Sequence, residues 1–154
     1  MRQLLHILYV CFMGLLWSNN INAQAMKDPT NWTFEAQKTG NNEYQLIFNL
    51  KLDKGFHIWS LRPGGDGFQV VPSFIFEENL SLVLVGKIEE QGKLITETME
   101  GIEGKVNYYS NEVKFIQKIK APAGTTIKGI HEYQVCNDMM CLPPTAKPFT
   151  FILK

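Results

Sequence analysis

Alternation of apolar and polar residues at every second position is the feature that most limits how this chain can fold. Residues 44–52 show it most clearly, because apolar residues at the even positions alternate with polar ones, and Ile47 is the only exception. Similar but less regular patterns occur at 32–38, 113–119, 127–135 and 149–153. A period of two places one face of a β-strand on a core and the other in water. No window of twelve residues carries a helical stripe, so we expect an all-β protein.

Turn-forming residues, chiefly Gly, Asn, Asp and Pro, separate these segments. They occur at 40–42, 53–55, 63–67, 110–111 and 122–124. About seven to nine short strands with frequent turns predict an immunoglobulin-like β-sandwich. We expect 127–135 and 146–153 to pair as antiparallel strands, with the residues between them at one end of the sandwich.

The first residues have the three-part pattern of a secretory signal peptide. Arg2 precedes a nearly uncharged apolar run, and a polar stretch then leads to small residues that suit cleavage after Ala23 or Ala25. The apolar run is fourteen residues long, which is too short for a membrane span. We therefore expect residues 1–23 to be removed and residues 24–154 to form one exported domain.

The charge of the mature chain is balanced. Removing Arg2 from the 15 basic residues leaves 14, against 15 acidic side chains. Without a basic patch or an acidic tail, nucleic acid and anionic membrane surfaces are not expected as partners. No later stretch is apolar enough to span a bilayer. The sequence also lacks a Ser-His-Asp arrangement, a phosphate-binding glycine loop and a paired-carboxylate site.

Cys136 and Cys141 are the only cysteines left once Cys11 is removed with the signal peptide. In the chain-entropy model, closing a loop of about six residues stabilises a fold by roughly 2 kcal/mol, against roughly 3 kcal/mol for fifteen residues. A pair that exchanges disulfides instead needs both sulfurs close together on an exposed loop, where a partner thiolate can reach one of them. The spacing therefore favours redox chemistry over a structural clip. Asp138 lies between the cysteines and no basic residue does, which disfavours a free thiolate.

Segments of this chain resemble one known family. They are 133–144, which holds the cysteines and a double proline, 55–59, 85–87 and 106–109. Together they resemble the N-terminal periplasmic domain of the DsbD-type thiol–disulfide interchange reductase, over essentially the whole mature chain. The resemblance implies the immunoglobulin-like fold, a periplasmic location and an electron relay that uses no cofactor. Its partners would be thioredoxin-fold periplasmic proteins, one supplying electrons and another receiving them.

Carried over residue by residue, the resemblance makes Cys136 and Cys141 the redox pair, with Cys141 as the attacking cysteine. The family's cap loop, which shields the disulfide until a partner arrives, corresponds to residues 97–105. This stretch contains no aromatic residue, so Met99 or Ile102 would shield the sulfurs instead. The resemblance also implies acidic and aromatic neighbours of the cysteines. Glu97 or Glu100 would supply the acidic neighbour, and His57 and Trp59 the aromatic neighbours.

Two features depart from the best-known members of the family. This chain has one residue fewer between its cysteines, and it stops at Lys154 without a membrane domain or a C-terminal thioredoxin domain. We therefore expect a free-standing version whose electron donor is a separate protein.

Two other functions fit the same residues, although the preferred hypothesis contains no metal site. Soft sulfur and imidazole ligands suit Cu(I), so a periplasmic Cu(I)-binding module is one alternative. The other is a β-sandwich interaction module in which the disulfide is structural. The Cu(I) ligands would come from Cys136, Met139, Met140 and Cys141, together with Met99, His57 or His131.

Overall fold

The structure, a computed structural model, describes residues 27–67 and 69–154. The predicted signal peptide lies outside the described residues. The described part of the chain contains eleven β-strands and no helix. The strands are β1 (Thr30–Gly40), β2 (Glu43–Leu52), β3 (His57–Gly64), β4 (Ser73–Phe76), β5 (Val83–Gly92), β6 (Ile95–Thr98), β7 (Lys105–Ser110), β8 (Glu112–Lys120), β9 (Thr126–Tyr133), β10 (Val135–Cys136) and β11 (Thr145–Ile152).

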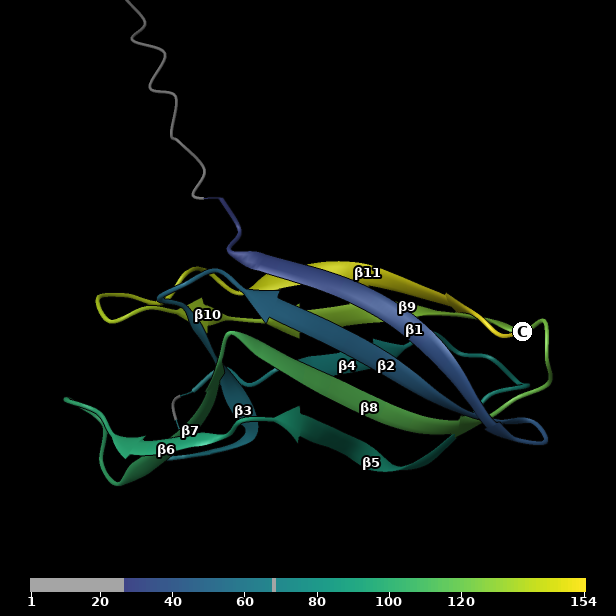
Figure 1. The fold of residues 1–154 in the computed structure, drawn as a ribbon, viewed down its shortest axis with the longest axis horizontal. Coiled ribbons are helices and arrows are strands. Elements are labelled where there is room, and N and C mark those ends of the chain that lie inside the picture. The colour runs from purple at the N-terminus through teal and green to yellow at the C-terminus, as the bar shows by residue number, and fades with distance from the viewer. Residues whose placement is uncertain (1–26, 68) are drawn as a thin grey trace, which may run out of the picture.

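The strands form three antiparallel sheets (Figure 1). A four-stranded sheet in the order β1-β2-β8-β5 shares its core with the three-stranded sheet β11-β9-β4. The third sheet, β10-β3-β7-β6, lies at the end of the sandwich away from the C-terminus. The chain connects the third sheet directly to both layers of the sandwich, because β7 leads into β8 of the four-stranded sheet and β9 of the three-stranded sheet leads into β10. The prediction of an all-β, immunoglobulin-like sandwich is confirmed.

The core forms from the strand faces that alternation predicts. In β2 the even-numbered residues from 44 to 52 are all buried. Phe48, in the middle of this face, contacts rings from the opposite layer. Their centroids lie 4.5 Å away for Phe74, 4.9 Å for Phe149 and 5.1 Å for Phe151. Burying a side chain of this size contributes roughly 1.5–3 kcal/mol, so these rings hold the two layers together.

The structure contains more strands than the seven to nine predicted. The pairing of β9 with β11 is confirmed, but β4, β6 and β10 are short and β5 is an edge strand with mostly exposed residues. Without a buried face, β5 carries no alternation that sequence reasoning could detect.

Gly64, expected in a turn, ends β3 instead, with a φ of +68°. A Cβ there would lie 2.5 Å from the carbonyl oxygen of Lys105, so this pairing requires glycine.

Asp28 fastens the start of β1 to the opposite layer. Its carboxylate accepts hydrogen bonds from the Thr30 hydroxyl and the Tyr133 hydroxyl, both at 2.7 Å, and from the ammonium of Lys147. Burial alone would raise the pKa of Asp28, but the hydrogen bonds of these three partners outweigh burial and lower it below its ordinary value. The bonds hold the chain next to the end of β9, where β10 begins.

His131 of β9 is buried in the aromatic core, with 1% of its surface exposed. The rings of Trp32 and Phe34 lie 4.7 Å and 5.5 Å from its own. Neither ring nitrogen has a partner at ordinary hydrogen-bond geometry among the described residues. Burial lowers the pKa of His131 to about 4, and the positive charge of Lys147 acts in the same direction. The histidine is therefore a neutral core residue at pH 7.

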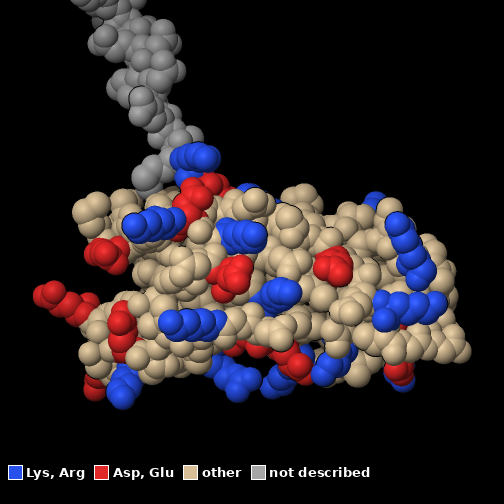
Figure 2. Space-filling view, in the orientation of Figure 1, with Lys and Arg blue, Asp and Glu red and all other residues tan. Residues whose placement is uncertain are grey.

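Basic and acidic side chains are interspersed on the face shown in Figure 2. Exposed ion pairs join Lys118 to Glu89 at 2.7 Å and Lys120 to Glu43 at 2.9 Å. Pairs of this kind contribute little stability because water screens them. No helix among the described residues is long and apolar enough to cross a membrane.

We predict that His131→Phe removes part of the acid sensitivity of the fold. The pKa of His131 is about 4 in the folded protein and about 6.5 in the unfolded chain, so between these pH values only the unfolded chain binds the proton. Wild-type stability should therefore fall by on the order of 3 kcal/mol as the pH drops through this window. Urea unfolding at pH 7 and pH 4.5 measures the loss. Equal losses in both proteins would contradict the prediction.

Candidate functional site

The two cysteines face each other across a tight antiparallel turn that follows β10. They form an isolated bridge at a position between two backbone hydrogen bonds, both of 2.9 Å. Non-hydrogen-bonded positions bring opposite residues closest together. The Cα atoms of Cys136 and Cys141 lie 3.9 Å apart and a disulfide joins the sulfurs. The flanking bonds run from the N–H of Asn137 to the carbonyl of Met140 and from the N–H of Leu142 to the carbonyl of Val135.

Side-chain amides hold this turn in place. Oδ1 of Asn137 accepts hydrogen bonds from the backbone N–H groups of Met139 and Met140, both at 2.9 Å. Nε2 of Gln134 donates to the carbonyl oxygen of Leu142 at 2.9 Å. Asparagine favours such turns because its side chain can replace a backbone acceptor. The turn is therefore organised by its own residues.

The two sulfur-bearing residues differ in their exposure. Cys136 lies in β10, opposite His57 of β3, and is only 2% exposed. Cys141 lies beyond the turn and is exposed. The sequence predicts both sulfurs at one end of the sandwich, where a partner thiolate can reach one of them. The structure places the pair at that end, with Cys136 buried and Cys141 exposed.

Cys136 belongs to a small apolar cluster separate from the main core. The other buried members are Trp59 of β3 and Val106 of β7. Two half-buried side chains next to the cluster, Met99 and Ile102, come from the loop between β6 and β7. This loop lies within the stretch that the resemblance identifies as the cap loop. The half-buried side chains that pack against the cluster are Val71, Met99, Ile102 and Tyr108.

Titratable groups border this cluster. The Tyr108 hydroxyl donates a hydrogen bond of 2.6 Å to the carboxylate of Glu97. Burial, this hydrogen bond and the negative charges of Glu97 and Asp138 raise the pKa of Tyr108 to about 12. The ring of His57 lies 4.8 Å from that of Tyr108 and 5.1 Å from that of Trp59. Burial lowers the pKa of His57, and the same two carboxylates partly offset this effect.

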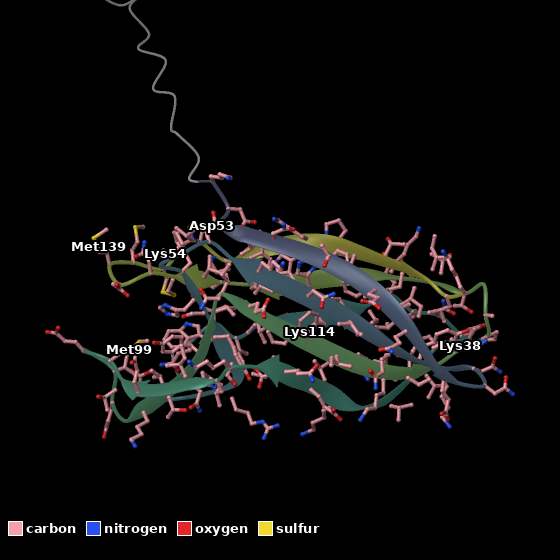
Figure 3. All side chains as sticks on the ribbon, in the orientation of Figure 1. Lys38, Asp53, Lys54, Met99, Lys114 and Met139 are labelled. Carbon is pink, nitrogen blue, oxygen red and sulfur yellow. A yellow bond between two sulfur atoms is a disulfide. The ribbon has the colours of Figure 1, made fainter. Side chains whose placement is uncertain are left out.

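The structure does not bring every candidate residue to the cluster. Glu100 is exposed in the turn after β6, and His131 lies in the main aromatic core. Met139 and Met140 are 88% and 47% exposed. Figure 3 shows Met139 and Met99 on different loops at the same end of the molecule. Within residues 27–67 and 69–154, no group of three or more His, Cys, Asp or Glu side chains is arranged to hold a metal ion.

Sequence reasoning assigns no role to Tyr108 or Asn137, although both shape the site. Tyr108 sits in a segment rich in aromatic residues, where no local pattern separates a core residue from a site residue. Asn137 could have been found, because an asparagine that begins a short loop is typical of a turn held by its side chain.

The family model for the N-terminal region of the thiol:disulfide interchange protein DsbD matches residues 22–152. The chain belongs to this family. The match confirms the resemblance seen in the sequence and identifies the molecule as a thiol–disulfide interchange domain with its cysteine pair in place. No curated protein matches the chain.

Two solved structures share the fold. The N-terminal periplasmic domain of ScsB from Proteus mirabilis is 17% identical, with a TM-score of 0.61, and the match covers 80% of this chain and 46% of that one. The chain thus spans less than half the length of the ScsB structure. The reduced DsbD N-terminal domain from Neisseria meningitidis is 15% identical, with a TM-score of 0.51 and coverage of 79% and 84%. At these identities the likeness concerns the fold alone.

We predict that Asn137→Ala makes the disulfide easier to reduce. Each of the two hydrogen bonds to its Oδ1 stabilises the turn by about 1 kcal/mol, and their loss lets the reduced loop open. The equilibrium constant for reduction by glutathione should rise roughly thirtyfold. Asn41→Ala, in the exposed turn between β1 and β2, serves as the matched control and should leave the constant unchanged. An unchanged constant in Asn137→Ala would show that the side chain does not organise the turn.

Proposed function

We propose that this domain passes electrons between thioredoxin-fold proteins through the Cys136–Cys141 disulfide. The observation that carries the proposal is the difference between the two cysteines, since Cys141 is exposed and Cys136 is 2% exposed. Thiol–disulfide exchange needs one sulfur that a partner can attack and a second that is released without leaving the protein. Membership of the interchange family supports the same chemistry.

The oxidised domain receives electrons in two steps. A donor thiolate attacks the Sγ of Cys141, the disulfide breaks, and Cys136 leaves as a thiolate that takes up a proton. The donor's second thiolate then attacks the mixed disulfide and releases Cys141. The donor is oxidised to a disulfide while the domain gains two electrons.

The reduced domain passes these electrons on in the reverse order. The Cys141 thiolate attacks the disulfide of an acceptor and forms a mixed disulfide with it. Cys136 then attacks the Sγ of Cys141 and releases the acceptor as a dithiol. Donor and acceptor bind in turn at one sulfur, so both interfaces are transient.

The proposed location is the periplasm. The signal-peptide pattern at residues 1–23 supports export, and the similar ScsB domain is described as periplasmic. Thioredoxin-fold proteins are the proposed partners because they carry paired redox cysteines that exchange with disulfides.

The loop between β6 and β7 covers the Cys136 side of the disulfide until a partner binds. Met99 and Ile102 pack against the cluster that contains Cys136. Met99 lies at the same end of the molecule as Met139, which belongs to the turn between the cysteines. Methionine has a flexible side chain, so it can leave this position without disturbing the strands.

The first test is covalent trapping with an oxidised thioredoxin-fold protein. Reduced Cys136→Ser should accumulate a mixed disulfide through Cys141, because the resolving thiol is missing. Reduced Cys141→Ser should accumulate none, because Cys136 is buried. Non-reducing gel electrophoresis with mass spectrometry identifies the linked cysteine. Trapping through Cys136 alone would reverse the proposed roles, and the absence of any mixed disulfide would argue against exchange.

The second test concerns the shield. Met99→Ser should speed the reduction of the disulfide by dithiothreitol severalfold, because the cluster around Cys136, the sulfur that leaves, becomes accessible to solvent. Met139→Ser is the matched control, since Met139 is 88% exposed at the same end of the molecule. Equal rates in Met99→Ser and the wild type would mean that Met99 does not shield the pair.

A further inference from the structure

His57 is placed where it can act on Cys136. The two residues are register partners in the β3–β10 pair, which puts their side chains on the same face of the sheet. Cβ atoms of opposite residues in an antiparallel pair lie about 4.5–5.5 Å apart. The imidazole therefore projects beside the Cys136 side chain, next to the rings of Trp59 and Tyr108.

One nitrogen of this imidazole lacks a partner. His57 is 8% exposed, and its Nε2 is buried without a hydrogen bond to any of the described residues. A buried polar atom without a partner is unfavourable and calls for an explanation. The disulfide sulfur of Cys136 carries no proton, so it cannot donate to Nε2. The reduced cysteine carries an S–H group, which can donate.

We propose that Nε2 of His57 accepts the proton of Cys136 when this cysteine resolves a mixed disulfide on Cys141. The inference rests on the exchange function proposed above and adds a general base to it. The resolving cysteine is buried at 2% exposure, so bulk water has little access to its proton. A neighbouring base removes that obstacle.

The proton and electron balance of the step is complete. The S–H proton of Cys136 moves to Nε2, and the resulting thiolate attacks the Sγ of Cys141. The Cys136–Cys141 bond forms while the bond between Cys141 and the partner sulfur breaks. The partner sulfur leaves with the electron pair as a thiolate and takes a proton from the imidazolium or from water. The two cysteines are oxidised and the partner disulfide has been reduced.

The groups around His57 suit this role. Its register partner on β7, Ser110, is neutral, and the charged or titratable groups that face it are Glu97 of β6, Tyr108 of β7 and Asp138 after β10. Burial lowers the pKa of His57, which leaves the ring neutral and able to accept a proton at pH 7. The carboxylates of Glu97 and Asp138 then stabilise the imidazolium that forms.

Oxidised glutathione is a suitable probe, because it reacts in two separable steps. Reduced domain is mixed with excess oxidised glutathione, quenched at intervals with N-ethylmaleimide and analysed by mass spectrometry. The glutathione adduct on Cys141 reports the first step, and its conversion to the Cys136–Cys141 disulfide reports the second. Wild type is compared with two variants, His57→Phe, which keeps a ring in the cluster, and His57→Gln. Using two variants keeps the test informative if one of them fails to fold. His131→Phe is the matched control, because His131 lies in the main core.

Both His57 variants should form the adduct at the wild-type rate but resolve it on the order of 100-fold more slowly at pH 7. Their resolution rates should keep rising through pH 8 as the thiol ionises unaided, whereas the wild-type rate should level off near neutral pH. His131→Phe should match the wild type in both steps. Wild-type rates and pH profiles in the His57 variants would overturn the role of His57 and leave the exchange function standing. A wild-type domain that forms no adduct would overturn both.

Discussion

The pairing of β10 with β3 is the interaction on which the whole site depends. Only two residue pairs form it, Val135 with Ile58 and Cys136 with His57. This short pairing buries one cysteine in the apolar cluster and sets a histidine beside it, while the turn that follows carries Cys141 into solvent. The difference in burial between the two bonded cysteines therefore follows from backbone pairing.

The sandwich acts as the rigid support for this end of the molecule. Aromatic rings on β2, β4 and β11 join the two layers, and the hydrogen bonds to Asp28 hold the start of β1 against β9 and β11. In the chain-entropy model, opening the small disulfide loop costs the fold about 2 kcal/mol, against a typical domain stability of about 5–15 kcal/mol. We therefore expect the core to stay intact when the disulfide is reduced.

Much of the fold could be predicted from the sequence, because burial of every second residue is a local signal. The buried face of β2 and the pairing of β9 with β11 are examples. The edge strand β5 has no such signal, since none of its residues is fully buried. For the site, the cysteine spacing indicated redox chemistry, but the burial of Cys136 and its alignment with His57 depend on a pairing between segments more than seventy residues apart. No local pattern encodes that register.

The measurement that tests the central claim most directly is the reduction potential of the Cys136–Cys141 pair in the mature domain, by equilibration with glutathione buffers. We predict a value of roughly −180 to −270 mV, within the range of proteins that exchange disulfides with one another. A value below about −300 mV would be typical of a structural disulfide. It would contradict the electron relay and leave an interaction module with a fixed disulfide.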